Sequence, residues 1–133
     1  QDRNAFAFVL CLTSNPSAAD FLKEGMAEKI AYWLQNYPQE NFGAVVGATY
    51  SANLKTMRNL LLNRILLIPG IGAQGGDLKT VLQEAKDSFA TPNILVNSSR
   101  GIIFASRGKD FASAARKEAR RLTREMKNAL SQE

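Results

Sequence analysis

Histidine is absent from this 133-residue chain, and cysteine occurs once, at Cys11. Without histidine the chain cannot build a Ser-His-Asp or Cys-His nucleophile arrangement, and the usual zinc sites lose a common ligand. A single cysteine cannot form an internal disulfide, which is typical of a protein in a reducing compartment. Cys11 lies in the apolar run 8–12 and is interpreted as a small buried hydrophobic side chain. We therefore predict a cytoplasmic protein with no metal site in this chain.

Long hydrophobic runs are also missing. No apolar run reaches the roughly 18–20 residues that a membrane-spanning helix needs, and the longest, such as residues 6–12, have the length of a strand. Hydrophobic residues make up 45% of the chain and charged residues 22%, values typical of a globular protein with one domain. The sequence starts with Gln1 rather than methionine and shows no signal-peptide pattern. The start of the sequence is typical of a chain that begins downstream of a true N-terminus. Since no run could span a membrane, we expect no membrane partner.

Positive charge is concentrated near the C-terminus. Residues 107–127 contain eight basic and three acidic side chains, which account for the whole net charge of +5. A basic helix can bind nucleic acid, but Phe111 is the only aromatic residue among the basic ones here. Small and apolar residues recur at helical spacing and give the segment a face for packing. We therefore favour the solvated outer face of a packed helix and expect no nucleic-acid partner. The apolar positions are Ala112, Ala115, Ala119, Leu122, Met126 and Leu130.

Apolar β-rich runs alternate with amphipathic helical patterns along the whole chain. Strands are predicted at residues 5–13, 43–49, 64–68 and 93–97, and helices at residues 18–36, 51–62, 77–89 and 109–129. Strands separated by helices indicate right-handed crossovers and a parallel sheet. The strands are almost continuously apolar, as expected where both faces of a sheet are covered. A doubly wound sheet and a (β/α) barrel both fit this pattern.

A glycine-rich loop follows the third predicted strand and precedes a helix. Residues 70–75 match G-x-G-x-x-G, the dinucleotide-binding pattern. That pattern also needs an acidic residue about 20 positions later, at the end of the next strand, to hold the ribose hydroxyls. The next strand instead ends Val96-Asn97-Ser98-Ser99-Arg100, with no acid. The loop is therefore a poor dinucleotide site, although a plain tight turn stays possible.

A single phosphate suits these residues better. Gly70, Gly72, Gly75 and Gly76 let the backbone approach an anion, Gln74 offers an amide donor, and the helix that starts near Gly76 presents free N–H groups. One strand later, Arg100 adds a guanidinium fork, and Ser98 and Ser99 add further donors. In (β/α)8 barrels the loops after strands seven and eight often form such a site. If these are the last two strands of a barrel, the chain supplies strands five to eight.

The same residues resemble a known family. Residues 69–77, Pro-Gly-Ile-Gly-Ala-Gln-Gly-Gly-Asp, followed by Asn-Ser-Ser-Arg-Gly-Ile at 97–102, resemble the C-terminal phosphate-binding half of orotidine 5′-monophosphate decarboxylase. Residues 12–16 resemble the end of that family's fifth strand, and residues 46–49 its sixth. The resemblance runs in order along nearly the whole chain. It implies an α/β fold in which residues 1–133 form the C-terminal half, strands five to eight, of a TIM (β/α)8 barrel.

The resemblance also implies roles for single residues. Gln74, Arg100 and a backbone N–H near Ser99 would bind the 5′-phosphate of orotidine 5′-monophosphate or UMP, while Ser14 would hydrogen-bond the pyrimidine and Pro69 would line its pocket. The family is a carboxy-lyase of pyrimidine biosynthesis that uses no cofactor and commonly forms homodimers. Relatives often have a longer segment near residues 21–23, so residues are missing there by comparison.

One departure from the family is large. Its reaction needs a lysine and two aspartates in an Asp-x-Lys-x-x-Asp arrangement, and the chain has only the partial match Asp77-Leu78-Lys79, with Leu82 at the last position. We therefore expect no catalytic residue in this chain, no activity of the chain alone, and a missing N-terminal half of the barrel as its partner. Two alternatives stay open: another phosphate-binding barrel isomerase or aldolase, and a non-catalytic half-barrel that dimerises.

Overall fold

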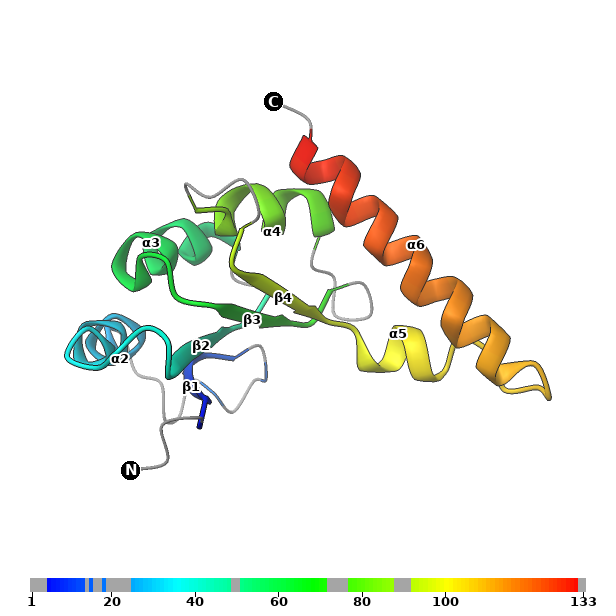
Figure 1. Ribbon diagram of the computed structural model, residues 1–133, viewed down its shortest axis with the longest axis horizontal. Coiled ribbons are helices and arrows are strands. Elements are labelled where there is room, and N and C mark those ends of the chain that lie inside the picture. The colour runs from blue at the N-terminus through cyan, green and yellow to red at the C-terminus, as the bar shows by residue number, and fades with distance from the viewer. Residues whose placement is uncertain are drawn as a thin grey trace.

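The computed structural model contains one sheet of four parallel strands in the consecutive order β1-β2-β3-β4 (Figure 1). The strands are β1 (Ala7–Leu12), β2 (Phe42–Val46), β3 (Leu66–Pro69) and β4 (Ile94–Asn97). The structure describes residues 5–13, 15, 18, 25–48, 51–71, 77–87 and 92–131. A consecutive order is that of a barrel wall, because a doubly wound sheet reverses direction at a switch point. The observed order thus separates the two architectures that the sequence pattern left open.

Helices follow each strand. They are α2 (Met26–Leu34), α3 (Ser51–Leu61), α4 (Leu78–Ala85), α5 (Ser99–Ile103) and α6 (Phe111–Ser131). Neighbouring helices touch in sequence order, α2 with α3, α3 with α4, and α4 with α6, while α5 packs on α6. In Figure 1, α2, α3 and α4 form a continuous layer on one side of the strands, and α6 extends beyond β4.

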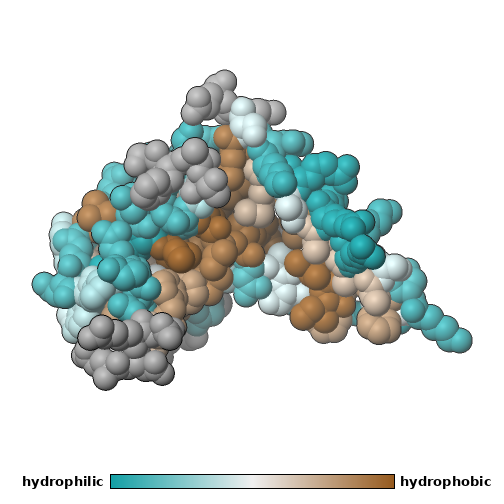
Figure 2. Space-filling model, viewed as in Figure 1, coloured by the Kyte–Doolittle hydropathy of each residue, from teal (hydrophilic) through white to brown (hydrophobic). Residues whose placement is uncertain are grey.

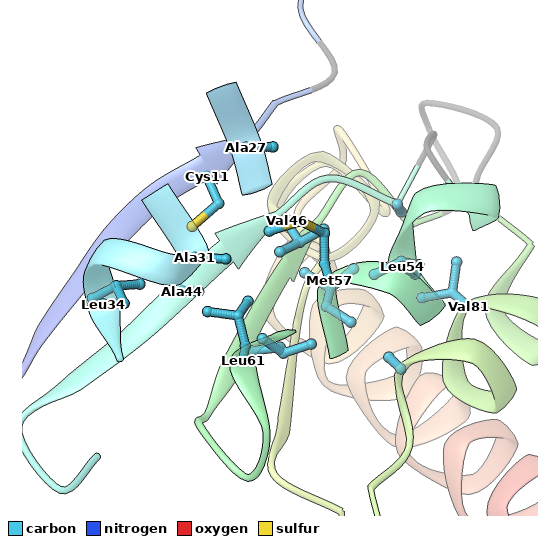
Figure 3. Packing of buried hydrophobic residues seen from close by; sticks show 14 of the residues in the cluster. Cys11, Ala27, Ala31, Leu34, Ala44, Val46, Leu54, Met57, Leu61 and Val81 are labelled. Atoms are coloured by element: carbon cyan, nitrogen blue, oxygen red, sulfur yellow. The ribbon is translucent and has the colours of Figure 1, made fainter. Parts of the chain in front are cut away.

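The hydrophobic core lies between this helix layer and one face of the sheet (Figure 3). Alternate strand residues point into it, as a period of two requires. They are Cys11, Ala44, Val46, Leu66 and Ile68, each fully buried. The helices contribute Ala31, Leu34, Leu54, Met57, Leu61 and Val81, which are also buried. Cys11 is free, as the sequence predicts, and burial raises the pKa of its thiol to about 11.

Among the described residues, no helix covers the opposite face of the sheet (Figure 1). Its large side chains are exposed: Phe8 to 38%, Leu10 to 51% and Leu95 to 49%. Figure 2 shows hydrophobic residues over the strands in the middle of the view and a second hydrophobic group at α5. Within the part of the chain that the structure describes, the expectation that both faces would be covered is therefore met on one face only. Since β1 and β4 end the order, each of them has an edge that pairs with no other described strand.

The sequence predicts all four strands and their intervening helices, with ends that differ by a few residues. Of the helix predicted at 18–36, the structure shows helix at Ala18 and from Met26 to Leu34, and most of the first half lies outside the described residues. The structure adds one element, α5, which the sequence analysis missed. Its five residues are too few to show a helical period, so the pattern resembles a turn.

The basic C-terminal helix packs as predicted. Leu122 and Ala129 are buried, and α6 contacts α4 and α5. The basic residues of α6 are exposed, and Arg121 bridges Glu118 at 2.6 Å and Glu125 at 2.5 Å. These i, i+3 and i, i+4 pairs belong to a solvated helix face. Within the part of the chain that the structure describes, no helix is long and apolar enough to cross a membrane.

Two buried arginines hold together the amino-terminal edge of the sheet. Arg58, on α3, donates to the carbonyls of Leu62, Arg64, Ala85 and Asn93 at 2.6–3.2 Å. Arg64, before β3, donates to those of Leu34, Tyr37, Pro38 and Phe42 at 2.5–3.2 Å. Burial lowers the pKa of both guanidinium groups, and the carboxylate of Asp87 opposes this for Arg58. The carbonyls lie near helix ends and strand starts, and those of Leu34, Pro38 and Asn93 also accept from backbone N–H groups.

Gly43 permits close contact between β1 and β2. A Cβ atom at this position would lie 2.6 Å from Cε1 of Phe8 and 2.7 Å from the backbone oxygen of Ile65. We expect Gly43→Ala to lower the free energy of unfolding by about 2 kcal/mol, because the backbone oxygen cannot move away as a side chain can. Urea unfolding of the protein measures this. Adding Phe8→Ala should recover only part of the loss, and an unchanged unfolding midpoint for Gly43→Ala would contradict the packing.

Leu62 has a left-handed backbone, with φ of +52°, directly after the end of α3. A residue with a Cβ atom is strained there, whereas glycine is not. Leu62 is 55% exposed, so removing its side chain loses little burial. We expect Leu62→Gly to raise the free energy of unfolding by about 0.5–1 kcal/mol. Leu62→Ala is the matched control, because alanine keeps the Cβ atom that causes the strain. Equal effects of the two variants would contradict this explanation.

Candidate functional site

A pocket of about 390 Å³ lies at the carboxyl ends of the strands. Thr13 and Asn15, after β1, form one side of it. The end of β3 and the start of its loop form another, and the turn into α5 forms the third. Its lining residues are Thr13, Asn15, Pro69, Gly70, Ile71, Asn97, Ser98, Ser99, Arg100 and Gly101. Ligands of parallel α/β proteins bind at this edge, so the fold alone makes the pocket a candidate site.

Backbone contacts fix the strand ends that form the pocket. Pro69 pairs with Asn97 in the parallel register of β3 and β4. The carbonyl of Pro69 accepts from the N–H of Ala48 at 2.9 Å, and that of Leu12 accepts from Gly47 at the same distance. Gly70 then turns the chain away with a φ of +98°, a conformation that favours glycine. The start of the predicted phosphate loop therefore needs its first glycine for a structural reason.

The pocket lining is polar and carries positive charge. Arg100 is exposed, and no carboxylate occurs among the described residues of the lining. The other polar groups are neutral hydroxyls and amides. Such a surface suits an anionic ligand with neutral polar groups. The expectation that this chain holds no catalytic residue stays a prediction.

Asp77 has a structural contact of its own near the loop. Its carboxylate caps α4 by accepting from the N–H of Thr80 at 2.8 Å, and this hydrogen bond lowers the pKa of Asp77. The Asp77-Leu78-Lys79 triplet thus begins a helix, as interpreted from the sequence. The cap also changes one expectation: an N–H of α4 that was predicted to be free for phosphate already has a partner.

The structure brings together part of the predicted site. Pro69, Gly70, Ser99 and Arg100 line one pocket, and the roles assigned to them stay predictions. The remaining predicted residues lie outside the described residues: Ser14, Gly72, Gln74, Gly75 and Gly76. Thr13 and Asn15, which flank Ser14 in the sequence, are part of the lining.

The sequence analysis assigned no role to Thr13, Asn15, Ile71 or Asn97, which also line the pocket. Their places in the sequence could have identified them, because each lies within three residues of the end of a strand. Among the described residues, no group of three His, Cys, Asp or Glu side chains could hold a metal ion.

Curated relatives and solved structures of one kind match this chain. No family model matches the chain. Orotidine 5′-phosphate decarboxylase of Leptospira interrogans is 44% identical over 126 residues, which cover 90% of this chain and 44% of that protein. The enzyme of the same name from Albidiferax ferrireducens is 44% identical over 135 residues, covering 85% of this chain and 46% of that protein. The chain is homologous to orotidine 5′-phosphate decarboxylases. It spans about half the length of the curated relatives that it matches.

Solved structures of an OMP decarboxylase and of a UMP synthase share this fold. OMP decarboxylase of Leishmania donovani matches with a TM-score of 0.65 and 30% identity, over 89% of this chain and 47% of that chain. UMP synthase of the same organism matches with a TM-score of 0.67 and 34% identity, over 89% of this chain and 27% of that one. The α/β architecture and its four parallel strands therefore correspond to part of a decarboxylase barrel.

Proposed function

We propose that this chain is the C-terminal half of a (β/α)8-barrel orotidine 5′-monophosphate decarboxylase, and that its pocket binds the 5′-phosphate and the pyrimidine of the substrate. The observation that carries the proposal is the pocket itself, where the loops after β1, β3 and β4 meet around Arg100. Homology to decarboxylases over 85–90% of the chain supports it.

The half-barrel assignment is supported by the uncovered face of the sheet. Phe8, Leu10 and Leu95 would become interior residues if further strands continued from the free edges of β1 and β4. Curated relatives contain about as many residues outside the matched region as inside it, which is enough for four more βα units. The remaining half of the barrel is thus the proposed partner of this face.

Arg100 is assigned to the phosphate, together with a backbone N–H near Ser99 and the amide of Gln74. Pro69 lines the pyrimidine pocket, and Ser14 hydrogen-bonds the base. In the proposed reaction the bond from C6 to the carboxylate breaks, its electron pair stays on C6, and CO₂ leaves. A lysine from the other half then protonates C6. Binding energy from the phosphate, far from C6, can lower the barrier of this step when it is realised in the transition state.

The experiment compares two proteins. The protein encoded with the segment upstream of Gln1 should convert orotidine 5′-monophosphate into UMP and CO₂, followed by absorbance and by release of labelled CO₂. The 133-residue chain alone should show no turnover. Turnover by the short chain would overturn the half-barrel assignment, whereas inactivity of the longer protein would overturn the enzyme assignment. In the longer protein, competition by 6-aza-UMP but not by ribulose phosphates separates a decarboxylase from a barrel isomerase.

The uncovered face also favours a second candidate, a non-catalytic half-barrel that covers the face with another copy of itself. Light scattering on the 133-residue chain separates the two. A stable, well-folded dimer with no second polypeptide would favour the self-paired half-barrel. A chain that aggregates alone, but folds when it is joined to the upstream segment, would favour the decarboxylase.

A further inference from the structure

Asn97 occupies a distinctive place in the pocket. It is the last residue of β4, paired with Pro69 on β3, and its side chain is exposed. Along β4 the side chains alternate, so Asn97 points to the same face as the exposed Leu95, away from the helix layer. This is the face that the proposed barrel would enclose. Asn97 therefore lies on the rigid strand itself, whereas Arg100 follows it in α5.

The hydrogen bonding of Asn97 orients its amide. The hydroxyl of Ser99 donates to its Oδ1 atom at 2.9 Å. Since this bond occupies the acceptor end of the amide, the donor end, Nδ2, is left for another partner. Among the described residues, no acceptor is hydrogen-bonded to Nδ2. The side chain thus presents N–H donors to the pocket in an orientation set by Ser99.

We propose that Asn97 is a further ligand-binding residue, whose amide donates to a neutral acceptor oxygen on the nucleoside part of the bound nucleotide. This inference rests on the proposed function. Arg100 supplies the charge that a phosphate needs, whereas a neutral amide on the strand suits a base carbonyl or a ribose hydroxyl. Ser99 is the positioning residue for this contact, because its hydroxyl holds the acceptor end of the amide.

Ligand pairs test the assignment in the whole protein that contains this chain. Affinities for UMP, ribose 5-phosphate and inorganic phosphate are measured by calorimetry for the wild type, Asn97→Ala and Asn97→Asp. Asn97→Ala should lower the affinity for UMP by about fivefold, which corresponds to the loss of one neutral hydrogen bond. It should leave the affinity for inorganic phosphate unchanged. Asn97→Asp should lower the affinity for UMP further, because a carboxylate replaces the N–H donor with an acceptor and repels the negative charge of the nucleotide. Asn59→Ala, an exposed asparagine on α3, is the matched control.

The affinity for ribose 5-phosphate shows which oxygen of UMP accepts the hydrogen bond from Asn97. If Asn97→Ala weakens UMP but not ribose 5-phosphate, the acceptor is on the base; if it weakens both, the acceptor is on the ribose. Unchanged UMP affinity in a folded Asn97→Ala protein would overturn the inference alone. Equal weakening of inorganic phosphate would overturn it too, because the amide would then serve the phosphate. A wild-type protein that binds none of the three ligands would overturn the proposed function together with this inference.

Discussion

Replacing Arg64 with alanine is expected to lower the free energy of unfolding by about 4 kcal/mol, among the largest effects of any single substitution. The side chain is 3% exposed, and its two terminal nitrogens donate to four backbone carbonyls. Alanine would remove all four of these hydrogen bonds, and each lost hydrogen bond costs about 1 kcal/mol or more. Urea unfolding followed by circular dichroism measures the change.

Two control variants make this test specific. Arg64→Lys keeps the charge but replaces a planar fork with a single ammonium group, so it should recover less than half of the loss. Arg120→Ala removes an exposed arginine from α6 and should change the stability by less than about 0.5 kcal/mol. If Arg64→Ala and Arg120→Ala had similar effects, the four hydrogen bonds would not stabilise the fold.

The buried arginines and the pocket lie at opposite edges of the sheet. Arg58 and Arg64 bind carbonyls at the amino-terminal edge, where the strands start and the helices end. The pocket lies at the carboxyl edge, about a strand's length away. Substitutions at the first edge should therefore change stability with little effect on ligand affinity, and substitutions in the pocket should do the reverse. This division is general among barrels, where chemistry gathers at the carboxyl ends.

The sequence predicted the elements well because their signals are local. Apolar runs of strand length and helical periods depend on neighbouring residues only, and both survived in the structure. The roles of Arg58 and Arg64 had no such signal. An arginine on a helix or before a strand has the same pattern whether it faces water or the carbonyls of distant residues. Its burial depends on contacts up to 35 positions away, which periodicity does not report.

The candidate site was predictable in part for the same reason. Glycines after a strand, and an arginine after the next, indicate an anion site from the sequence alone. Asn97 was not singled out, because its importance comes from the direction of its side chain and from Ser99, and both depend on the local backbone. The uncovered face was not predictable from composition either. Phe8 and Leu10 have the pattern of a strand buried on both sides, and only the arrangement of the helices shows which side is open.

Replacing Arg100 with alanine is expected to weaken the binding of UMP by about 100-fold in the whole protein. Arg100 is the charged residue of the described pocket lining, and a bidentate contact between a guanidinium and a phosphate contributes about 3 kcal/mol. Uridine lacks the phosphate, so its affinity should be the same for Arg100→Ala and the wild type. Calorimetric titration with both ligands isolates the phosphate contribution from any general damage to the pocket.

Lysine at the same position gives the sharper test of geometry. Arg100→Lys keeps the charge but loses the planar fork, so UMP binding should weaken by about tenfold, between the wild type and alanine. Arg107→Ala, an exposed arginine in the turn between α5 and α6 that is not part of the lining, should leave UMP affinity within about twofold. If Arg100→Ala weakened the binding of uridine as much as the binding of UMP, Arg100 would support the shape of the pocket rather than bind the phosphate. Full affinity in Arg100→Lys would mean that charge alone holds the phosphate, and the guanidinium fork would have no part in recognition.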